Sequence, residues 1–426
     1  MKRGLGVAAP RIAVGGSTLA VTRRCNERKL LWTPSGPAVS NGYLWSLAKM
    51  QRAEKVEVHH ACLMPNHAHE TITPTAETNL GEALRLLHRE SARFRQEDLL
   101  ARGYDAPQAV WDKRQTHAMH LVDVGAQNEW ILYEHLNVVE AGLVARVEDY
   151  PGLVTPLSLL KGGVVPVPRP EVYTSRSEPR EMELVITPTP EQRRLYGEDL
   201  EGLSYWMEKA AARRERQLQR EREAAGRRVI GAERLRRIHP FSEPATPRER
   251  RGRRAPRFKV GRGFEESARR ALVEQLVNED AHFQLEHAEA KQRWVEGDRN
   301  VEFPFGTLQM VTEHGAAMAE VRDGAVLCAP SRVISVPDWT PRQAVEVAAS
   351  AIGDIADELE DEGPLVIVEP GEARVVGDGE GGAIHAHSVE EVRLQSPTRT
   401  ADRRHPARLV TLRTRRRRRG GGEPET

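Results

Sequence analysis

The chain has 426 residues, of which 39% are hydrophobic, 5% aromatic and 29% charged, too few apolar residues for one core throughout its length. Its net charge of +1 averages over basic blocks at 248–262 and 413–419 and an acidic stretch at 350–364, so the average indicates nothing about partners. Three scattered cysteines exclude a disulfide framework and a cysteine zinc site, and they indicate a reducing, cytoplasmic location. No apolar run reaches the roughly 18 residues that a membrane-spanning helix needs.

The first 152 residues show the periodicities of a mixed domain. Residues 12–29 predict a strand or hairpin arm, residues 39–56 a helix with an apolar stripe, and residues 55–64 and 68–73 two strands. Two further helices are predicted at 79–102 and 128–147, with a strand at 115–124 between them. This order matches a ferredoxin-like βαββαβ sheet with an added C-terminal helix, so the predicted fold class is α+β.

The pattern weakens beyond residue 152. Residues 153–200 are rich in proline and valine and predict a linker. Residues 201–325 predict a mostly helical, charged accessory region, with a solvated helix at 203–238, another helix at 264–296 and a strand pair at 300–320. Residues 326–426 predict a low-order tail, acidic and then Arg-rich. The basic blocks could bind nucleic-acid phosphates or serve as solubilising linkers, and 248–262 is not expected to pack.

A His-x-His pair, His67 and His69, follows the turn at Pro65-Asn66. On a strand both side chains point to one face, and two imidazoles that lie close together can bind one metal ion. When a His-x-His motif occurs without other signals, it more often consists of two surface histidines. His59 and His60 precede the motif, and one of them should share the face of His67, although a structural place is favoured over a metal role.

Tyr133 and Asn137 lie one turn apart in the last predicted helix of this domain and therefore share a face. A tyrosine hydroxyl that points at a metal-bound phosphate can attack phosphorus and form a phosphotyrosine link. Without the other motifs, Tyr133 is better interpreted as a core residue with its hydroxyl at the edge of the core.

Three stretches together resemble the single-tyrosine HUH transposases, in particular the REP-associated tyrosine transposases and their insertion-sequence relatives. They are CLMPNHAHE at 62–70, Trp111 in AVWDKR, and YEHLNVVEAGLVARVEDYP at 133–151. The resemblance covers residues 10–152 and implies a metal-dependent enzyme that nicks and rejoins single-stranded or hairpin DNA through a 5′-phosphotyrosine intermediate. It leaves a homodimer open.

The resemblance also implies the roles of individual residues. Tyr133 would be the nucleophile, His67 and His69 the metal ligands, and Asn137 the side chain that completes the metal shell. The implied metal is magnesium or manganese, whereas two imidazoles alone would also suit zinc or copper. The residues expected to bind DNA are Arg23, Arg24 and Asn26 after the first strand, and Trp111, Lys113 and Arg114 in a later loop, although Trp111 is equally well interpreted as a core residue.

Two positions depart from the family pattern. Val138 stands where proline is usual, and Glu70 and Thr71 stand where two apolar residues usually follow the second histidine. Glu70 should face away from the metal if the strand alternates, as a solvent-side residue or a partner in a dimer or the core. These departures keep two alternatives open. One is a decayed or domesticated relative that binds hairpin DNA without cutting it, and the other is a structural metal-binding module unrelated to DNA.

Overall fold

A computed structural model describes residues 10–114, 116–172, 177–244, 256–327, 340–358 and 367–368. The predicted order of elements in the first domain is confirmed, and with it the α+β fold class. The elements are β1 (Leu19–Arg24), α1 (Pro37–Glu54), β2 (Val56–Leu63), β3 (His67–Pro74), α2 (Leu80–Ala101), β4 (His117–Leu121) and α3 (Val124–Glu140), with short 3-10 turns at Asn26–Arg28 and Val147–Asp149.

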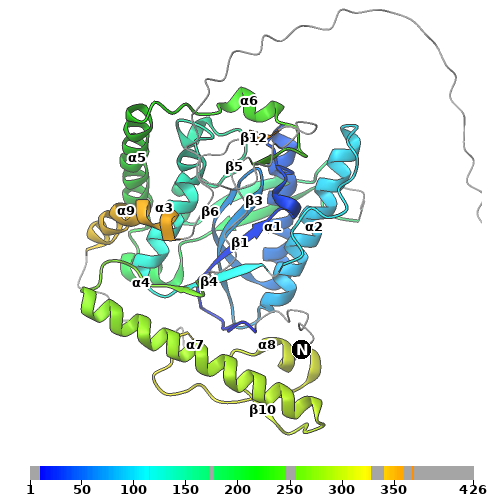
Figure 1. Ribbon diagram of the computed structural model, residues 1–426, viewed down its shortest axis with the longest axis vertical. Helices are drawn as coiled ribbons and strands as arrows, with labels where there is room; N and C mark the ends of the chain where they lie inside the picture. Colours follow the sequence, from blue (N-terminus) through cyan, green and yellow to red (C-terminus); the bar gives the residue numbers. More distant parts are fainter. Residues whose placement is uncertain are drawn as a thin grey trace, which may run out of the picture. The chain divides into compact units, whose positions relative to one another are not determined.

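These strands belong to one larger sheet, in the order β6 (Gly163–Pro168), β7 (Glu181–Ile186), β2, β3, β1, β4 and β9 (Phe258–Lys259), with β5 (Leu153–Val154) beside β2. β1 runs antiparallel to both β3 and β4, and β2 and β3 form an antiparallel pair. Figure 1 shows α1 and α2 on one side of the strands and α3 on the other. Because β-strand side chains alternate, the sheet contributes to two separate cores: Leu19 and Val21 of β1 lie in the core under α1 and α2, and Ala20 lies in the core under α3.

The third helix begins four residues before the predicted start. Asp123 is its N-cap, and the Asp123 carboxylate accepts a hydrogen bond from the amide of Ala126 at 3.0 Å. The helix ends at Glu140, two residues before Gly142, whose φ of 69° lies in the left-handed region. The cap therefore fixes where Tyr133 and Asn137 stand along the helix.

The segment 153–200 is not a linker in the structure. It forms β5 (Leu153–Val154), a 3-10 turn (Leu157–Lys161), β6 (Gly163–Pro168), β7 (Glu181–Ile186) and α4 (Pro190–Tyr196). β7 lies parallel to β2, and β6 pairs with β7 at the edge of the sheet. Two of the prolines that suggested a linker, Pro166 and Pro168, lie in β6, an edge strand, where a missing backbone donor is tolerated.

The helix predicted as solvated is packed on one side. α5 (Leu200–Ala224) buries Leu203, Met207 and Ala210 in the core that contains α3. α9 (Pro341–Glu358) packs against the same helix. Figure 1 shows α3 with α5 and α9 on one side and the sheet on the other. The sequence predicted the helix but not its packing, because the buried stripe consists of only a few apolar side chains among many charged ones.

The end of the basic block 248–262 also packs, contrary to expectation. β9 (Phe258–Lys259) lies parallel to β4 at the far edge of the sheet. The Lys259 ammonium lies 3.1 Å from the Glu129 carboxylate, and both side chains are buried. The carboxylate on α3 thus compensates a cation that would otherwise not enter a core. The second basic block, 413–419, lies outside the described residues.

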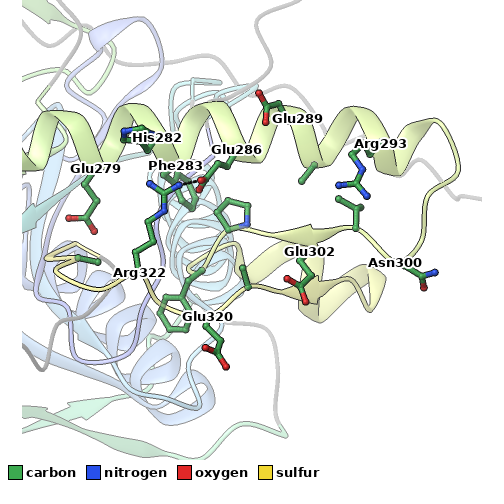
Figure 2. Close-up of a pocket in the computed structure, with 16 residues that line it drawn as sticks. Glu279, His282, Phe283, Glu286, Glu289, Arg293, Asn300, Glu302, Glu320 and Arg322 are labelled. Atoms are coloured by element: carbon green, nitrogen blue, oxygen red, sulfur yellow. Dashed lines mark ion pairs between the residues drawn. The ribbon is translucent and has the colours of Figure 1, made fainter.

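The predicted helix and strand pair beyond residue 260 are confirmed. They are α7 (Glu266–Val295), β10 (Glu302–Phe303) and β11 (Ala317–Met318), with α8 (Leu308–His314) between the strands; α6 (Ala232–Arg237), β8 (Glu243–Pro244) and β12 (Ile367–Val368) complete the described elements. A cavity of about 610 Å³ lies between α7 and the β10–β11 segment. Figure 2 shows glutamates from both sides around it, with an ion pair between Glu286 and Arg322. Such an acidic rim would repel phosphate, so nucleic acid does not suit this cavity.

No helix in the described part of the chain is long and apolar enough to cross a membrane.

Candidate active site

The His-x-His pair lies on β3 with both rings on the α3 face of the sheet. The ring centroids of His67 and His69 are 4.6 Å apart, and the rings are perpendicular. Each Nδ1 has a close polar partner: Asn66 Oδ1 at 2.7 Å from His67, and Thr22 Oγ1 at 3.0 Å from His69. A carboxamide oxygen only accepts, so Nδ1 of His67 donates to Asn66, and a neutral His67 ring then has its lone pair at Nε2. Metal-binding histidines are oriented in this way by a partner at the other ring nitrogen.

Tyr133 and Asn137 of α3 stand over this pair. The Asn137 amide nitrogen lies 3.2 Å from His69 Nε2 and donates to the Tyr133 hydroxyl at 3.4 Å. The rings of Tyr133 and His69 are 6.0 Å apart. The structure therefore brings together all four residues of the predicted nucleophile and metal shell.

All four side chains are buried. The exposed fractions are 1% for Tyr133, 2% for His69, 3% for His67 and 5% for Asn137. Burial, followed by the neighbouring charge of His67, lowers the pKa of His69 well below its ordinary value. His69 is therefore neutral, which is the form that binds a metal. A phosphate could reach the tyrosine only after some side chain or segment moves.

The side chains at this site suit a metal ion that keeps some of its coordination positions open for water or substrate. Among the described residues no three histidine, cysteine, aspartate or glutamate side chains are grouped to hold a metal. A shell here would consist of His67, His69, the Asn137 amide after a flip about its terminal bond, and water. Such a set neutralises no charge on the ion, so phosphate oxygens could complete it, as at catalytic rather than structural sites.

Arg23 and Arg24, the two arginines of β1 that were expected to bind DNA, lie on opposite faces of the strand. Arg24 pairs in register with His67 and therefore shares its face. Arg23 lies on the α1 and α2 face, where its guanidinium donates to Thr116 Oγ1 at 3.1 Å. Only Arg24 therefore points to the same side of the sheet as the histidines. Asn26 is half-buried, and its backbone amide bonds to the carbonyl of Val110 at 2.9 Å.

Trp111 is a core residue. Its indole is 6% exposed, stacks on Trp32 at 5.4 Å and donates from Nε1 to Ser91 Oγ at 3.1 Å. A buried ring of this kind is closed to an unpaired base. Lys113 and Arg114, two and three residues further on, are exposed, and Arg114 pairs with Asp112 at 3.0 Å.

Two buried carboxyl groups lie on either side of β3. Glu70 faces away from the histidines, as alternation predicts, and accepts a hydrogen bond from Tyr43 in the core under α1. Burial raises the pKa of Glu70 to about 8. Glu134 of α3 lies on the histidines' side and contacts His60 and Thr71. No motif in the sequence pointed to Glu134, although this residue falls on the same helical face as Trp130 and Asn137.

Comparison with known proteins gives two similar solved structures. No family model matches the chain, and no curated protein matches it. A REP-associated tyrosine transposase bound to a REP hairpin is 19% identical over 34% of this chain and 81% of the other, with a TM-score of 0.28. A Deinococcus radiodurans R1 protein described as a "putative transposase" is 15% identical over 28% of this chain and 85% of the other, with a TM-score of 0.20. Both likenesses are confined to about a third of this chain or less.

Proposed function

We propose that this chain is a metal-dependent transposase that nicks and rejoins single-stranded or hairpin DNA through a 5′-phosphotyrosine intermediate. One observation carries the proposal. The Asn137 amide lies between the Tyr133 hydroxyl, at 3.4 Å, and His69 Nε2, at 3.2 Å. A nucleophile thereby stands beside a pair of imidazoles that could hold a metal ion, the arrangement that phosphoryl transfer to tyrosine needs.

The chemistry uses two displacements at phosphorus. The Tyr133 oxygen forms a bond to the 5′-phosphate, the bond from phosphorus to the 3′ oxygen breaks, and the phenol proton goes to the leaving 3′ oxygen. A 3′-hydroxyl of a second strand then attacks the same phosphorus and returns its proton to Tyr133. When bound, magnesium or manganese would neutralise the phosphate oxygens. His67, His69 and Asn137 would hold that ion.

Binding of the strand would rely on phosphate contacts and shape. Arg24 shares the face of the histidines, and Lys113 and Arg114 are exposed. Cations of this kind give salt-dependent affinity without sequence readout. Trp111 is left out of the proposed DNA contacts because it is buried. The homodimer stays a prediction, which sedimentation of the free protein would test.

A second candidate function is binding of hairpin DNA without cleavage. The 1% exposure of the Tyr133 side chain favours it, because a nucleophile must reach phosphorus. The departures at Val138 and Glu70 point the same way. The two candidates agree on DNA binding and differ only in the covalent step.

Covalent adduct formation separates the candidates. Wild-type protein is mixed with a pool of single-stranded hairpins and either Mg²⁺ or Mn²⁺, and adducts are separated under denaturing conditions. We expect an adduct with wild type and none with Tyr133→Phe, which should still bind the hairpins. Tyr150→Phe is the matched control, because its buried hydroxyl donates to the Leu63 carbonyl at 2.8 Å rather than to the site.

Hairpin binding by wild type without an adduct in either metal would establish the second candidate. Absence of salt-dependent binding would contradict both and leave a metal-binding module unrelated to DNA.

A further inference from the structure

A buried carboxyl group directly follows Tyr133 in the chain. The Glu134 side chain is fully buried, with an exposed fraction of 0%. Its Oε1 accepts from Trp130 Nε1 at 2.6 Å, and its Oε2 accepts from Thr71 Oγ1 at 2.9 Å. The same Oε2 lies 3.1 Å from His60 Nδ1. Three polar groups therefore converge on one carboxyl group inside the protein.

These partners tie the nucleophile's helix to the strands beneath it. His60 lies on β2, and Thr71 lies on β3, two residues beyond His69 and on the same face. Trp130 lies on α3 itself, and its ring is 5.2 Å from the ring of Tyr133 and 6.1 Å from that of His69. The network thus touches both sides of the proposed active site without entering it.

The directions of these bonds restrict how α3 can lie on the sheet. Rotating the helix by one residue, about 100°, would carry Tyr133 and Asn137 away from His69. Apolar contacts tolerate small rotations because they have no preferred direction, whereas hydrogen bonds weaken steeply with angle. A rotation would also leave a buried carboxyl group without partners, which is strongly destabilising.

We propose that Glu134 is the positioning residue of the nucleophile. Through His60, Thr71 and Trp130 it fixes α3 in the one orientation in which the Tyr133 hydroxyl and the Asn137 amide stand at His69. This role rests on the proposed function of Tyr133.

Burial disfavours the charged forms of both Glu134 and His60. Burial raises the pKa of Glu134 well above its ordinary value, and burial lowers the pKa of His60 to about 3. Both directions favour the uncharged forms of the two side chains, in which the carboxyl group can donate a hydrogen bond to His60 Nδ1 at 3.1 Å. A glutamine can replace such an acid, because its amide also offers one acceptor to Trp130 and donors to the other partners.

The same helix supplies a matched control. Glu129 is another fully buried carboxylate on α3, and its partners are the Lys259 ammonium at 3.1 Å and the Arg262 amide at 2.8 Å. These partners lie on β9 and the residues after it, not on β2 or β3. Removing Glu129 should therefore cost stability without changing the orientation of Tyr133.

The first test compares Glu134→Leu, Glu134→Gln and Glu129→Leu by single-turnover adduct formation at saturating hairpin and Mn²⁺. We expect Glu134→Leu to lower the rate about 100-fold while hairpin affinity stays unchanged. Glu134→Gln should recover most of the rate, and Glu129→Leu should react like wild type. A wild-type rate in Glu134→Leu, or an equal loss in Glu129→Leu, would overturn the positioning role.

A second readout does not depend on activity. Tyr133 is 1% exposed, so it should resist nitration by tetranitromethane in wild type and in Glu129→Leu. It should react in Glu134→Leu, as measured on the tryptic peptide. If Glu134→Leu does not fold, Thr71→Val removes one bond of the network and takes its place. If Tyr133 stays protected from nitration in the variant, the positioning role of Glu134 is overturned, whether or not wild type forms an adduct. If wild type forms no adduct, only the proposed reaction is contradicted.

Discussion

Two pairs of histidines lie on neighbouring strands, and their difference shows what makes a candidate metal site. His67 and His69 are separated by one residue on β3 and bring their rings to 4.6 Å. His59 and His60 are adjacent on β2, at an irregularity of the register between Val58 and His60. His59 bonds to the Thr187 carbonyl at 2.8 Å and to Thr73 Oγ1 at 2.7 Å, whereas His60 contacts Glu134.

All four of these histidines are almost fully buried, so burial does not distinguish the pairs. The difference lies in what the ring nitrogens face. Both ring nitrogens of His59 and of His69 have polar partners in the protein, but the partner of His69 Nε2 is the Asn137 amide, which lies beside Tyr133. A structural histidine has its partners built in, and a metal-binding one has a nitrogen directed toward other potential ligands.

The largest expected contrast between the pairs is in catalysis. His69→Ala should lower metal-dependent adduct formation at least about 100-fold, because a bound ion contributes several kcal/mol to phosphoryl transfer. His59→Asn should react at the wild-type rate. Single-turnover gels at saturating hairpin measure both. Equal losses in the two variants would mean that the pairs do not differ in function.

The next contrast is in metal-dependent stability. An ion that binds only the folded protein raises the free energy of unfolding by about 2.7 kcal/mol at 100 times its dissociation constant. Calorimetric Tm should rise with Mn²⁺ for wild type and His59→Asn, and chelation should reverse the rise. The Tm of His67→Ala should not respond. If the Tm of His67→Ala rose with Mn²⁺ as much as that of wild type, the metal site would not lie at the histidines of β3.

The last expected change, which is small for each pH unit, is in acid stability. Burial lowers the pKa of His59 from 6.5 to about 3. The unfolded chain therefore binds a proton between these pH values that the folded chain does not, and stability falls as the pH falls below 6.5. His59→Asn should reduce this slope by up to about 1.4 kcal/mol per pH unit between pH 4 and 6. Urea unfolding across that range measures it, and an unchanged slope would contradict a buried neutral His59.

Part of the fold and site followed from local patterns. The period-two spacing of His67 and His69, and the one-turn spacing of Tyr133 and Asn137, predicted two pairs that each share a face. The same alternation predicted that Glu70 points away from the histidines, which the core contact with Tyr43 confirms. Strand and helix periods are properties of a few consecutive residues, so they are readable without knowing the rest of the chain.

Other features depended on residues far apart in the sequence. The strand β7 pairs with β2 across more than a hundred residues, and β9 joins β4 from the end of a basic block. From the sequence around it, Trp111 could either stack on an unpaired DNA base or belong to the core. Only the positions of Trp32 and Ser91 decide between these two interpretations. Glu134 looked like an ordinary helix residue until β2 and β3 supplied its partners.

The sequence by itself determined which residues could form the candidate site and on which face of each element they lie. The tertiary structure decided that the two faces meet, that Asn137 comes between Tyr133 and His69, and that a buried carboxyl group beside the tyrosine is bonded to both strands. The reason is physical. Periodicity fixes the direction of a side chain relative to its own backbone, whereas hydrogen bonds in a core depend on which distant segments pack together.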